Sequence, residues 1–305
     1  MICPVVESVI ENTPLVGANS HRLKTPDAIP QHNGGKMDTL STHVFLETSA
    51  PVSGTTVAAA TEKISRRRTA SNGSSPVVSS ENQVLNSIPH RLFEALRPHL
   101  RRIYVAKEQF LFQQDDELEY VYFPETAVIS EFHILDDGRM VEVSITGHEG
   151  AIGIATLYRA RRISNCVQVT QAGNVLKIES SLLKKLSRLH PELPLLMHTY
   201  LENYIRQISQ KAVCNMYHSV EERFCTWLLM VQDRCGSSML KLTHEQIART
   251  LGVYRPSVTC IALDMRKKRL IDYSRGGISI RDRDQMQDFA CGCYTELETH
   301  SEIAH

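Results

Sequence analysis

Residues Leu242 to Arg283 have the sequence LTHEQIARTLGVYRPSVTCIALDMRKKRLIDYSRGGISIRDR. Thr243 and Gln246 have the spacing of a capping box, which predicts that a helix starts here. Gly252 stands where that helix should end, because glycine adopts a positive φ at little cost. Pro256 suits the first turn of a second helix, where its missing N–H is not needed. The stretch therefore predicts two helices joined by a tight turn.

A pair of short strands is predicted directly after the second helix, from Ile271 to Ile280 around Gly276 and Gly277. The apolar residues that should hold the two helices together are Ile247, Leu251, Val253, Val258 and Ile261. A plain helical hairpin could share the helix–glycine–helix pattern. Together with the cap, the proline and the strand pair, the pattern favours a winged helix-turn-helix, which is a DNA-binding motif.

The distribution of charge supports contact with nucleic acid. The whole chain has 34 basic and 34 acidic residues and hence no net charge. From Gly236 to Gln285, however, ten residues are basic and five are acidic, so this part alone has a net charge of +5. A basic module of this kind attracts phosphate.

Composition also sets the expected compartment. The sequence has no apolar run long enough for a membrane span and no secretory signal pattern at its start. Its eight cysteines are scattered and form no disulfide framework. We therefore expect a cytoplasmic protein without a membrane anchor.

The part before the helix-turn-helix divides by pattern. Residues 1–82 are rich in Ser, Thr, Pro, Asn and Ala and are predicted to be disordered. A short amphipathic helix is predicted from Asn86 to Arg97. Short β-rich runs follow, and they predict a β-barrel or β-roll. These runs are 110–112, 120–123, 128–129, 132–135, 141–145, 167–169 and 175–178, with a hairpin turn at Asp136–Gly138.

A long helix is predicted next, from about Leu193 to Met216. Its apolar residues Met197, Leu201, Tyr204, Ile208 and Ala212 have heptad-like spacing. The helix could pack back on the roll, but its length favours a seam between two copies of the chain. Ser219 and Glu222 form a second capping box, which predicts another helix start.

This order of elements resembles the Crp/Fnr family of bacterial transcription regulators. The stretch LTHEQIARTLGVYRPSVT is similar to the family's helix-turn-helix, and Val121–Pro124, Gly147–Gly150 and Gly153 resemble turn residues of its roll. The resemblance implies an α+β fold with five parts. These are a disordered tail (1–82), a cyclic-nucleotide-binding-like β-roll (83–190), a dimerisation helix (191–217), a winged helix-turn-helix (218–290) and a C-terminal tail (291–305).

The resemblance also implies function. Family members are homodimers that bind a double-stranded DNA operator, and RNA polymerase is an expected partner. In the nucleotide-dependent activators, three positions of the recognition helix read bases with Arg, Glu and Arg. Those positions here hold Arg255, Pro256 and Cys260, so we expect a different operator. The candidate DNA contacts are Thr243, Tyr254, Arg255, Ser257, Thr259, Cys260 and Arg275. Residues 266–269, all basic, could contact phosphate or form a solvated face.

The sensing chemistry of the family is not matched by these residues. Cyclic-nucleotide binders of the family place Glu after a glycine and Arg-Ser or Arg-Thr at the phosphate. Here Ile154 follows Gly153, and Arg161 and Arg162 precede the phosphate position. Oxygen sensors hold an iron–sulfur cluster on four cysteines, whereas only Cys3 precedes Cys166 here. We expect no cofactor, and the effector stays open.

Neither a metal site nor an active site is expected from the motifs. Cys291 and Cys293 offer two thiols, whereas a closed zinc site needs four ligands. We therefore expect these two cysteines to lie in a surface tail. No triad, paired-carboxylate or phosphate-loop pattern is present in the sequence, so we expect no enzyme. The alternative is a ligand-binding sensor or assembly protein that binds DNA without specificity.

Overall fold

The computed structural model describes residues 79–274 and 276–299. Most of the predicted disordered tail therefore lies outside the described residues. Asn82, however, is fully buried. Its side chain caps helix α1 (Gln83–Ser87) and donates hydrogen bonds of 2.8 Å to the carbonyls of Pro124 and Gly150. The tail boundary at residue 82 is thus wrong, because Asn82 fastens the first helix to the roll.

The single helix expected from Asn86 to Arg97 is two helices. Helix α1 ends at Ser87, α2 spans His90–Leu96, and a 3-10 turn, η2, covers Arg97–His99. Pro89 separates them, because proline forces the residue before it out of the helical region, and Ile88 is extended at ψ 147°. The apolar residues Ile88, Leu92 and Leu96 are nevertheless buried, as their spacing predicts.

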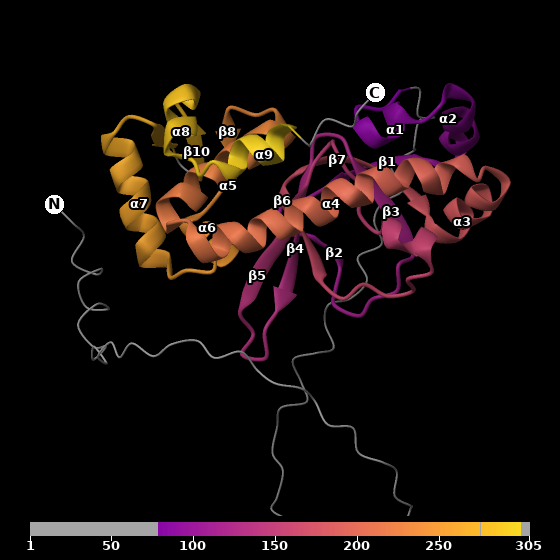
Figure 1. Cartoon of the computed structure of the whole chain (residues 1–305), viewed down its shortest axis with the longest axis horizontal. Coiled ribbons are helices and arrows are strands. Elements are labelled where there is room, and N and C mark those ends of the chain that lie inside the picture. Colours follow the sequence, from indigo (N-terminus) through magenta and orange to yellow (C-terminus); the bar gives the residue numbers. More distant parts are fainter. Residues whose placement is uncertain (1–78, 275, 300–305) are drawn as a thin grey trace, which may run out of the picture. The chain divides into compact units, whose positions relative to one another are not determined.

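The β-roll consists of two antiparallel sheets, with strand orders β1-β7-β3 and β2-β6-β4-β5 (Figure 1). The strands are β1 (Arg101–Val105), β2 (Phe110–Phe112), β3 (Tyr120–Pro124), β4 (Val128–Ile134), β5 (Met140–Thr146), β6 (Cys166–Gln171) and β7 (Gly173–Glu179). A 3-10 helix, η3 (Ile154–Tyr158), and helix α3 (Ser180–Leu189) complete this part. The two sheets enclose an apolar core.

The predicted strands are present, with two differences. The runs 128–129 and 132–135 belong to one strand, β4, which pairs with β5 across the hairpin turn at Asp136–Gly138 and bends at a register shift between Glu131 and Phe132. Strand β1 was not predicted. It begins with two exposed arginines and buries only Val105, so its sequence lacks the alternation that marks a strand.

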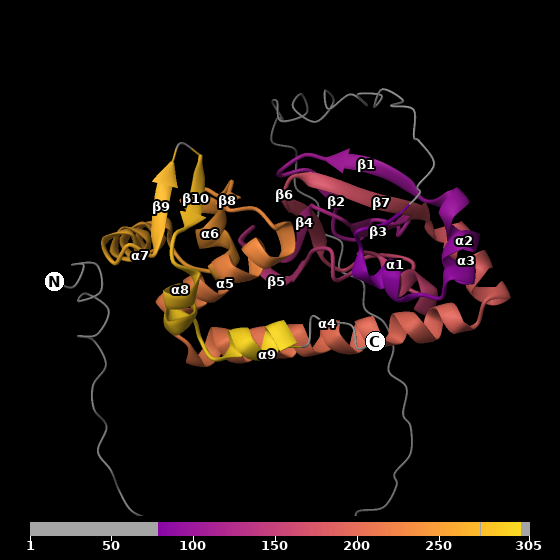
Figure 2. The same cartoon turned by 90° about the horizontal axis from the view of Figure 1, so that it is seen from above.

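Helix α4 (Glu192–Tyr217) has 26 residues and runs along the roll and toward the C-terminal part (Figure 2). Its buried face packs on the roll through Leu193, Met197 and Tyr200. Tyr204 packs against the same cluster. The predicted seam is therefore wrong at Met197 and Tyr204, which serve the chain's own core. The exposed apolar side chains of α4 include Ile205 and Met216, at 62% and 75% exposure.

The C-terminal part is built on helix α5 (Val220–Cys235), which starts at the predicted Ser219–Glu222 capping box. The other elements are β8 (Met239–Leu240), α6 (His244–Leu251), α7 (Arg255–Lys267), β9 (Ile271–Ser274), β10 (Gly277–Ile280), α8 (Arg283–Phe289) and α9 (Cys293–Thr299). Phe224, Leu228 and Val231 of α5 are fully buried, and residues of α6, α7 and the strands pack around them. Among the described helices, none is long and apolar enough to cross a membrane.

The surface-tail interpretation of Cys291 and Cys293 is wrong. Both side chains are buried, at 3% and 6% exposure. Cys291 donates its backbone N–H to the Thr226 hydroxyl of α5 at 3.0 Å, and Cys293 begins helix α9. The chain thus turns back after α8 and packs on α4 and α5, which a two-thiol motif does not reveal.

Candidate nucleic-acid interface

Helix α6 has the boundaries that the sequence predicts. The Thr243 hydroxyl accepts the Gln246 N–H at 3.2 Å, and the Gln246 side chain accepts the Thr243 N–H at 2.9 Å. The helix ends at Gly252, whose φ of 67° lies in the left-handed region, where a side chain is disfavoured. The turn therefore directs the chain into α7. Thr243 is exposed, but its hydroxyl already serves as the cap.

Helix α7 has one buried and one accessible side. Val258, Ala262 and Met265 are fully buried against the core. Tyr254 is 84% exposed and Arg255 is also exposed, while Ser257 and Cys260 are half-buried. No side chain caps the first turn, because Tyr254 occupies the N-cap position. The N–H groups and positive dipole end of this turn therefore lie beside Arg255, as an anion-binding helix start requires.

Thr259 has a different environment from the other predicted contacts. Its hydroxyl donates to the Arg255 carbonyl at 3.1 Å and bonds to Nδ1 of His244 at 3.0 Å. Nε2 of His244 bonds in turn to the Tyr273 hydroxyl at 2.8 Å. A neutral imidazole with its proton on Nδ1 satisfies these bonds. These hydrogen bonds connect α7, α6 and β9. Thr259 therefore helps to position the elements of the motif relative to one another.

The electrostatics of His244 agree with a neutral ring. Its pKa is lowered, first by burial and second by the positive charge of Arg255. Sequence reasoning missed His244 and Tyr273, because each is a single polar residue with no motif around it. Only the packing of α6 against β9 shows that they meet, with ring centroids 5.2 Å apart.

The wing is present as strands β9 and β10, with β8 as an additional partner in the order β8-β10-β9. Ser274 pairs with Gly277, so the tip lies where the glycine pair predicts it. Arg275, which stands between Ser274 and Gly276 in the sequence, lies outside the described residues. Its role as a phosphate contact stays a prediction.

The basic residues at the end of α7 are not equivalent. Lys268 contacts Asp264 at 2.8 Å and Glu221 at 2.9 Å, and its ammonium lies 4.5 Å from the centre of the Phe289 ring. The hydrogen bond to Asp264 is the main cause of its raised pKa. Lys268 is therefore engaged within the chain. Arg266, Lys267 and Arg269 are exposed, and both interpretations stay open for them.

Comparison with known proteins agrees with this geometry. Residues 222–289 match the family model of the Crp-like helix-turn-helix domain. The chain is 22% identical over 213 residues to the global nitrogen regulator of Synechocystis sp., covering 67% of this chain and 94% of the relative. It is 21% identical to the anaerobic regulatory protein of Bacillus subtilis, covering 68% of this chain and 90% of the relative. Its fold is similar to FixK2 from Bradyrhizobium japonicum, with a TM-score of 0.55, 17% identity, and coverage of 63% of this chain and 98% of that one.

The chain thus carries a Crp-like helix-turn-helix domain and resembles Crp/Fnr-type transcription regulators over about two-thirds of its length. Its helix-turn-helix domain, its β-roll and the long helix between them all have counterparts in that type of protein.

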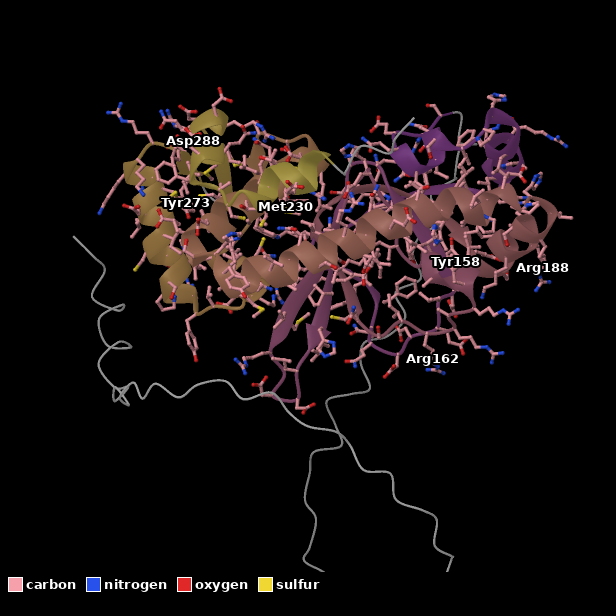
Figure 3. All side chains as sticks on the ribbon, in the orientation of Figure 1. Tyr158, Arg162, Arg188, Met230, Tyr273 and Asp288 are labelled. Atoms are coloured by element: carbon pink, nitrogen blue, oxygen red, sulfur yellow. The ribbon has the colours of Figure 1, made fainter. Side chains whose placement is uncertain are left out.

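The roll of this chain has an acidic hollow at Arg162. Gly153 precedes η3 and has a φ of 84°. The residues that line this hollow include Asp115, Asp116, Glu117 and Glu119. Arg162 donates to the Asp115 carbonyl at 2.7 Å, and its side chain is 61% exposed at the edge of the roll (Figure 3). A hollow with four acidic residues and one arginine disfavours a phosphate anion.

Proposed function

We propose that the chain acts as a homodimer that binds a specific double-stranded DNA operator. The observation that carries the proposal is the accessible N-terminal end of α7, where Tyr254 and Arg255 project from a helix whose opposite side is buried. A recognition helix enters the major groove by this end. A guanidinium there can bind a guanine edge through two hydrogen bonds.

Recognition by this surface divides between two kinds of contact. Arg255 is the base-reading candidate, with Tyr254, Ser257 and Cys260 beside it. Arg275 at the wing is the phosphate candidate. Phosphate contacts position a protein on DNA and carry no sequence information, whereas base contacts specify the site. Pro256 has no N–H and no side-chain acceptor, so the operator should differ from that of the nucleotide-dependent activators.

Dimerisation is proposed through the exposed side of α4. Leu201, Ile205, Ile208, Ala212 and Met216 follow one another at spacings of three and four residues, which places them along one side of the helix. This stripe keeps Leu201, Ile208 and Ala212 of the sequence-based seam, and Leu201 is half-buried because it also packs partly against the roll. Paired winged helices would then contact two half-sites related by a two-fold axis. RNA polymerase is the expected partner of the DNA-bound dimer.

Selection from a randomised operator library at two salt concentrations tests the proposal. Arg255→Ala should cost about 1–3 kcal/mol per half-site and relax preference at one symmetric pair of guanines. Arg275→Ala should weaken binding to all sequences alike and lower the salt slope by about one counterion per contact. If Arg255→Ala instead lowers affinity equally for all sequences, Arg255 contacts phosphate and not a base. A wild-type protein without any preference would support the alternative, a sensor that binds DNA non-specifically.

A further inference from the structure

Four potential metal ligands meet where α4 passes into α5. Cys214 lies in the last turns of α4, His218 follows that helix, and Cys291 and Cys293 come from the segment after α8. Their ligand atoms all lie within 4.8 Å of one another. The three cysteines are buried and His218 is half-buried. Cys214 and His218 thus supply the two ligands that the Cys291–Cys293 pair lacks in the sequence.

Two of the distances between these atoms match those expected around a single tetrahedral ion. With Zn–S bonds of about 2.3 Å, two thiolates on one Zn²⁺ lie about 3.8 Å apart, and a thiolate and an imidazole nitrogen about 3.5 Å. The sulfurs of Cys214 and Cys291 are 3.8 Å apart. The Cys293 sulfur and Nδ1 of His218 are 3.6 Å apart. These two pairs share no residue, so they form opposite edges of the tetrahedron.

We propose that Cys214, His218, Cys291 and Cys293 bind one Zn²⁺ in a closed structural site. Thiolate and imidazole ligands select a soft or borderline ion over Mg²⁺ or Ca²⁺. Three cysteines and one histidine are an established structural zinc set, and they leave no position for a reacting water. Ligand atoms this close together converge on one ion, whereas a cluster of several irons needs its sulfurs spread more widely.

Neighbouring polar groups are placed to support thiolates. The side-chain amide of Gln210 donates to the Cys293 sulfur at 2.6 Å. The Thr226 hydroxyl lies 3.1 Å from the Cys291 sulfur and accepts that residue's N–H at 3.0 Å. Donors around metal-bound sulfur orient the ligand and balance its charge. The pocket that contains Cys214 and Cys291 also contains the cation Arg223.

The metal would fasten the C-terminal segment to the start of the DNA-binding part. Helix α9 lies beside α4 in Figure 2, and Cys293 begins it. The four ligands come from two stretches that are far apart in the sequence, since Cys214 and Cys291 are separated by 77 positions. Binding one ion across that separation adds its free energy to folding. The proposed ion therefore has a structural role and not a catalytic one.

Metal content of the full-length protein is the first test. The chain is purified under reducing conditions, supplied with Zn²⁺, dialysed, and measured by plasma mass spectrometry. We expect one zinc per chain. Replacement of Zn²⁺ by Co²⁺ should give the visible bands of tetrahedral cobalt and a thiolate charge-transfer band. A chelator should lower the melting temperature, and added Zn²⁺ should restore it.

Variants assign the ligands. Cys293→Ser and His218→Ala should reduce the zinc content to background. His218→Cys should retain zinc, because a fourth thiolate can replace the imidazole. Cys235→Ser is the matched control, since this cysteine lies on α5 outside the cluster, and it should keep one zinc per chain.

Three results would overturn the proposal. The first is a reduced wild-type protein that takes up neither Zn²⁺ nor Co²⁺. The second is wild-type zinc content in both Cys293→Ser and His218→Ala. The third is a cobalt spectrum without a thiolate band, which decides the matter on the wild-type protein even if a variant does not fold. A Cys214–Cys291 disulfide that persists in reductant would count with the first result.

Discussion

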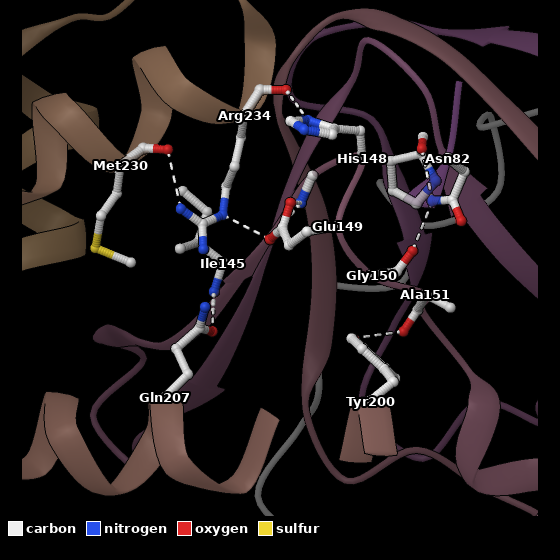
Figure 4. Close-up of polar contacts among 12 residues, drawn as sticks. Asn82, Ile145, His148, Glu149, Gly150, Ala151, Tyr200, Gln207, Met230 and Arg234 are labelled. Carbon is white, nitrogen blue, oxygen red and sulfur yellow. Dashed lines mark hydrogen bonds and ion pairs between the residues drawn. The ribbon is translucent and has the colours of Figure 1, made fainter. Parts of the chain in front are cut away.

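The Arg234 guanidinium at the end of α5 donates a hydrogen bond of 2.7 Å to the Glu149 carboxylate in the roll (Figure 4). Both side chains are almost buried, at 7% and 11% exposure. Arg234 also donates to the Met230 carbonyl, and Glu149 accepts the N–H of Gly147. A Cβ at Gly147 would lie 2.5 Å from Cβ of Arg234, so the glycine permits this close approach. The pair links the roll directly to the helix that supports the DNA-binding part.

Removing one partner of this ion pair should destabilise the protein strongly. In Arg234→Ala, Glu149 keeps its charge in a buried place without a cation, and such losses cost about 3–5 kcal/mol. Denaturant unfolding at neutral pH measures the loss. The exposed pair Arg139–Asp137 has the same distance of 2.7 Å, with exposures of 75% and 52%. Asp137→Asn is therefore the control and should cost less than about 1 kcal/mol. Equal losses for the two variants would contradict the assigned role of burial.

Acid should weaken the DNA-binding part through His244. Its pKa in the folded protein is below the unfolded value, chiefly because the ring is buried. The unfolded state then binds the proton more readily, so this contribution to stability is complete above the unfolded pKa of about 6.5 and is lost as the pH falls below it. Thermal unfolding of wild type and His244→Gln from neutral to mildly acidic pH checks this. The variant should lose less stability in acid than wild type. If its melting temperature falls with pH as steeply as that of wild type, His244 is not the cause.

Cyclic nucleotides should not bind the roll in the micromolar range. Cyclic-nucleotide binders of the family have a Glu after this glycine, whereas Ile154 follows Gly153 here. The hollow at Arg162 is also lined by four acidic residues. Calorimetric titration with cyclic AMP and cyclic GMP should therefore give no saturable heat. A micromolar dissociation constant that is lost in Arg162→Ala would show that this arginine reaches the phosphate after all.

Substitution on the exposed side of α4 should separate the dimer without unfolding the chain. Ile205 is 62% exposed within one copy, so Ile205→Asp costs that copy little and instead places two carboxylates at the proposed seam. Sedimentation should show a monomer, and operator binding should weaken.

Leu195 provides the control for that experiment. It is 72% exposed on α4, and its separation of ten residues places it about 80° around the helix from Ile205. Leu195→Asp should leave the dimer intact. If Ile205→Asp remains a dimer while Leu195→Asp becomes a monomer, the seam lies on the face of α4 that carries Leu195.

Local sequence determined the helix-turn-helix and most strands of the roll. Capping boxes at Ser219 and Thr243, the positive φ at Gly252 and the hairpin at Asp136–Gly138 each depend on residues within a few positions of one another. Such features follow from backbone sterics and nearby hydrogen bonds, so they can be predicted from a short window of sequence.

Tertiary structure alone decided which side of α4 is buried and which polar residues meet. Met197 and Tyr204 fit a heptad seam by spacing, but a periodic apolar stripe does not state whether a partner chain or the chain's own roll covers it. In the fold, Thr259, His244 and Tyr273 form one chain of hydrogen bonds, although they are distant in the sequence. Cys291 likewise lies beside Cys214 and His218 only in the folded chain. Each of these groups has no local pattern, because its members are brought together by packing of separate elements and not by the backbone between them.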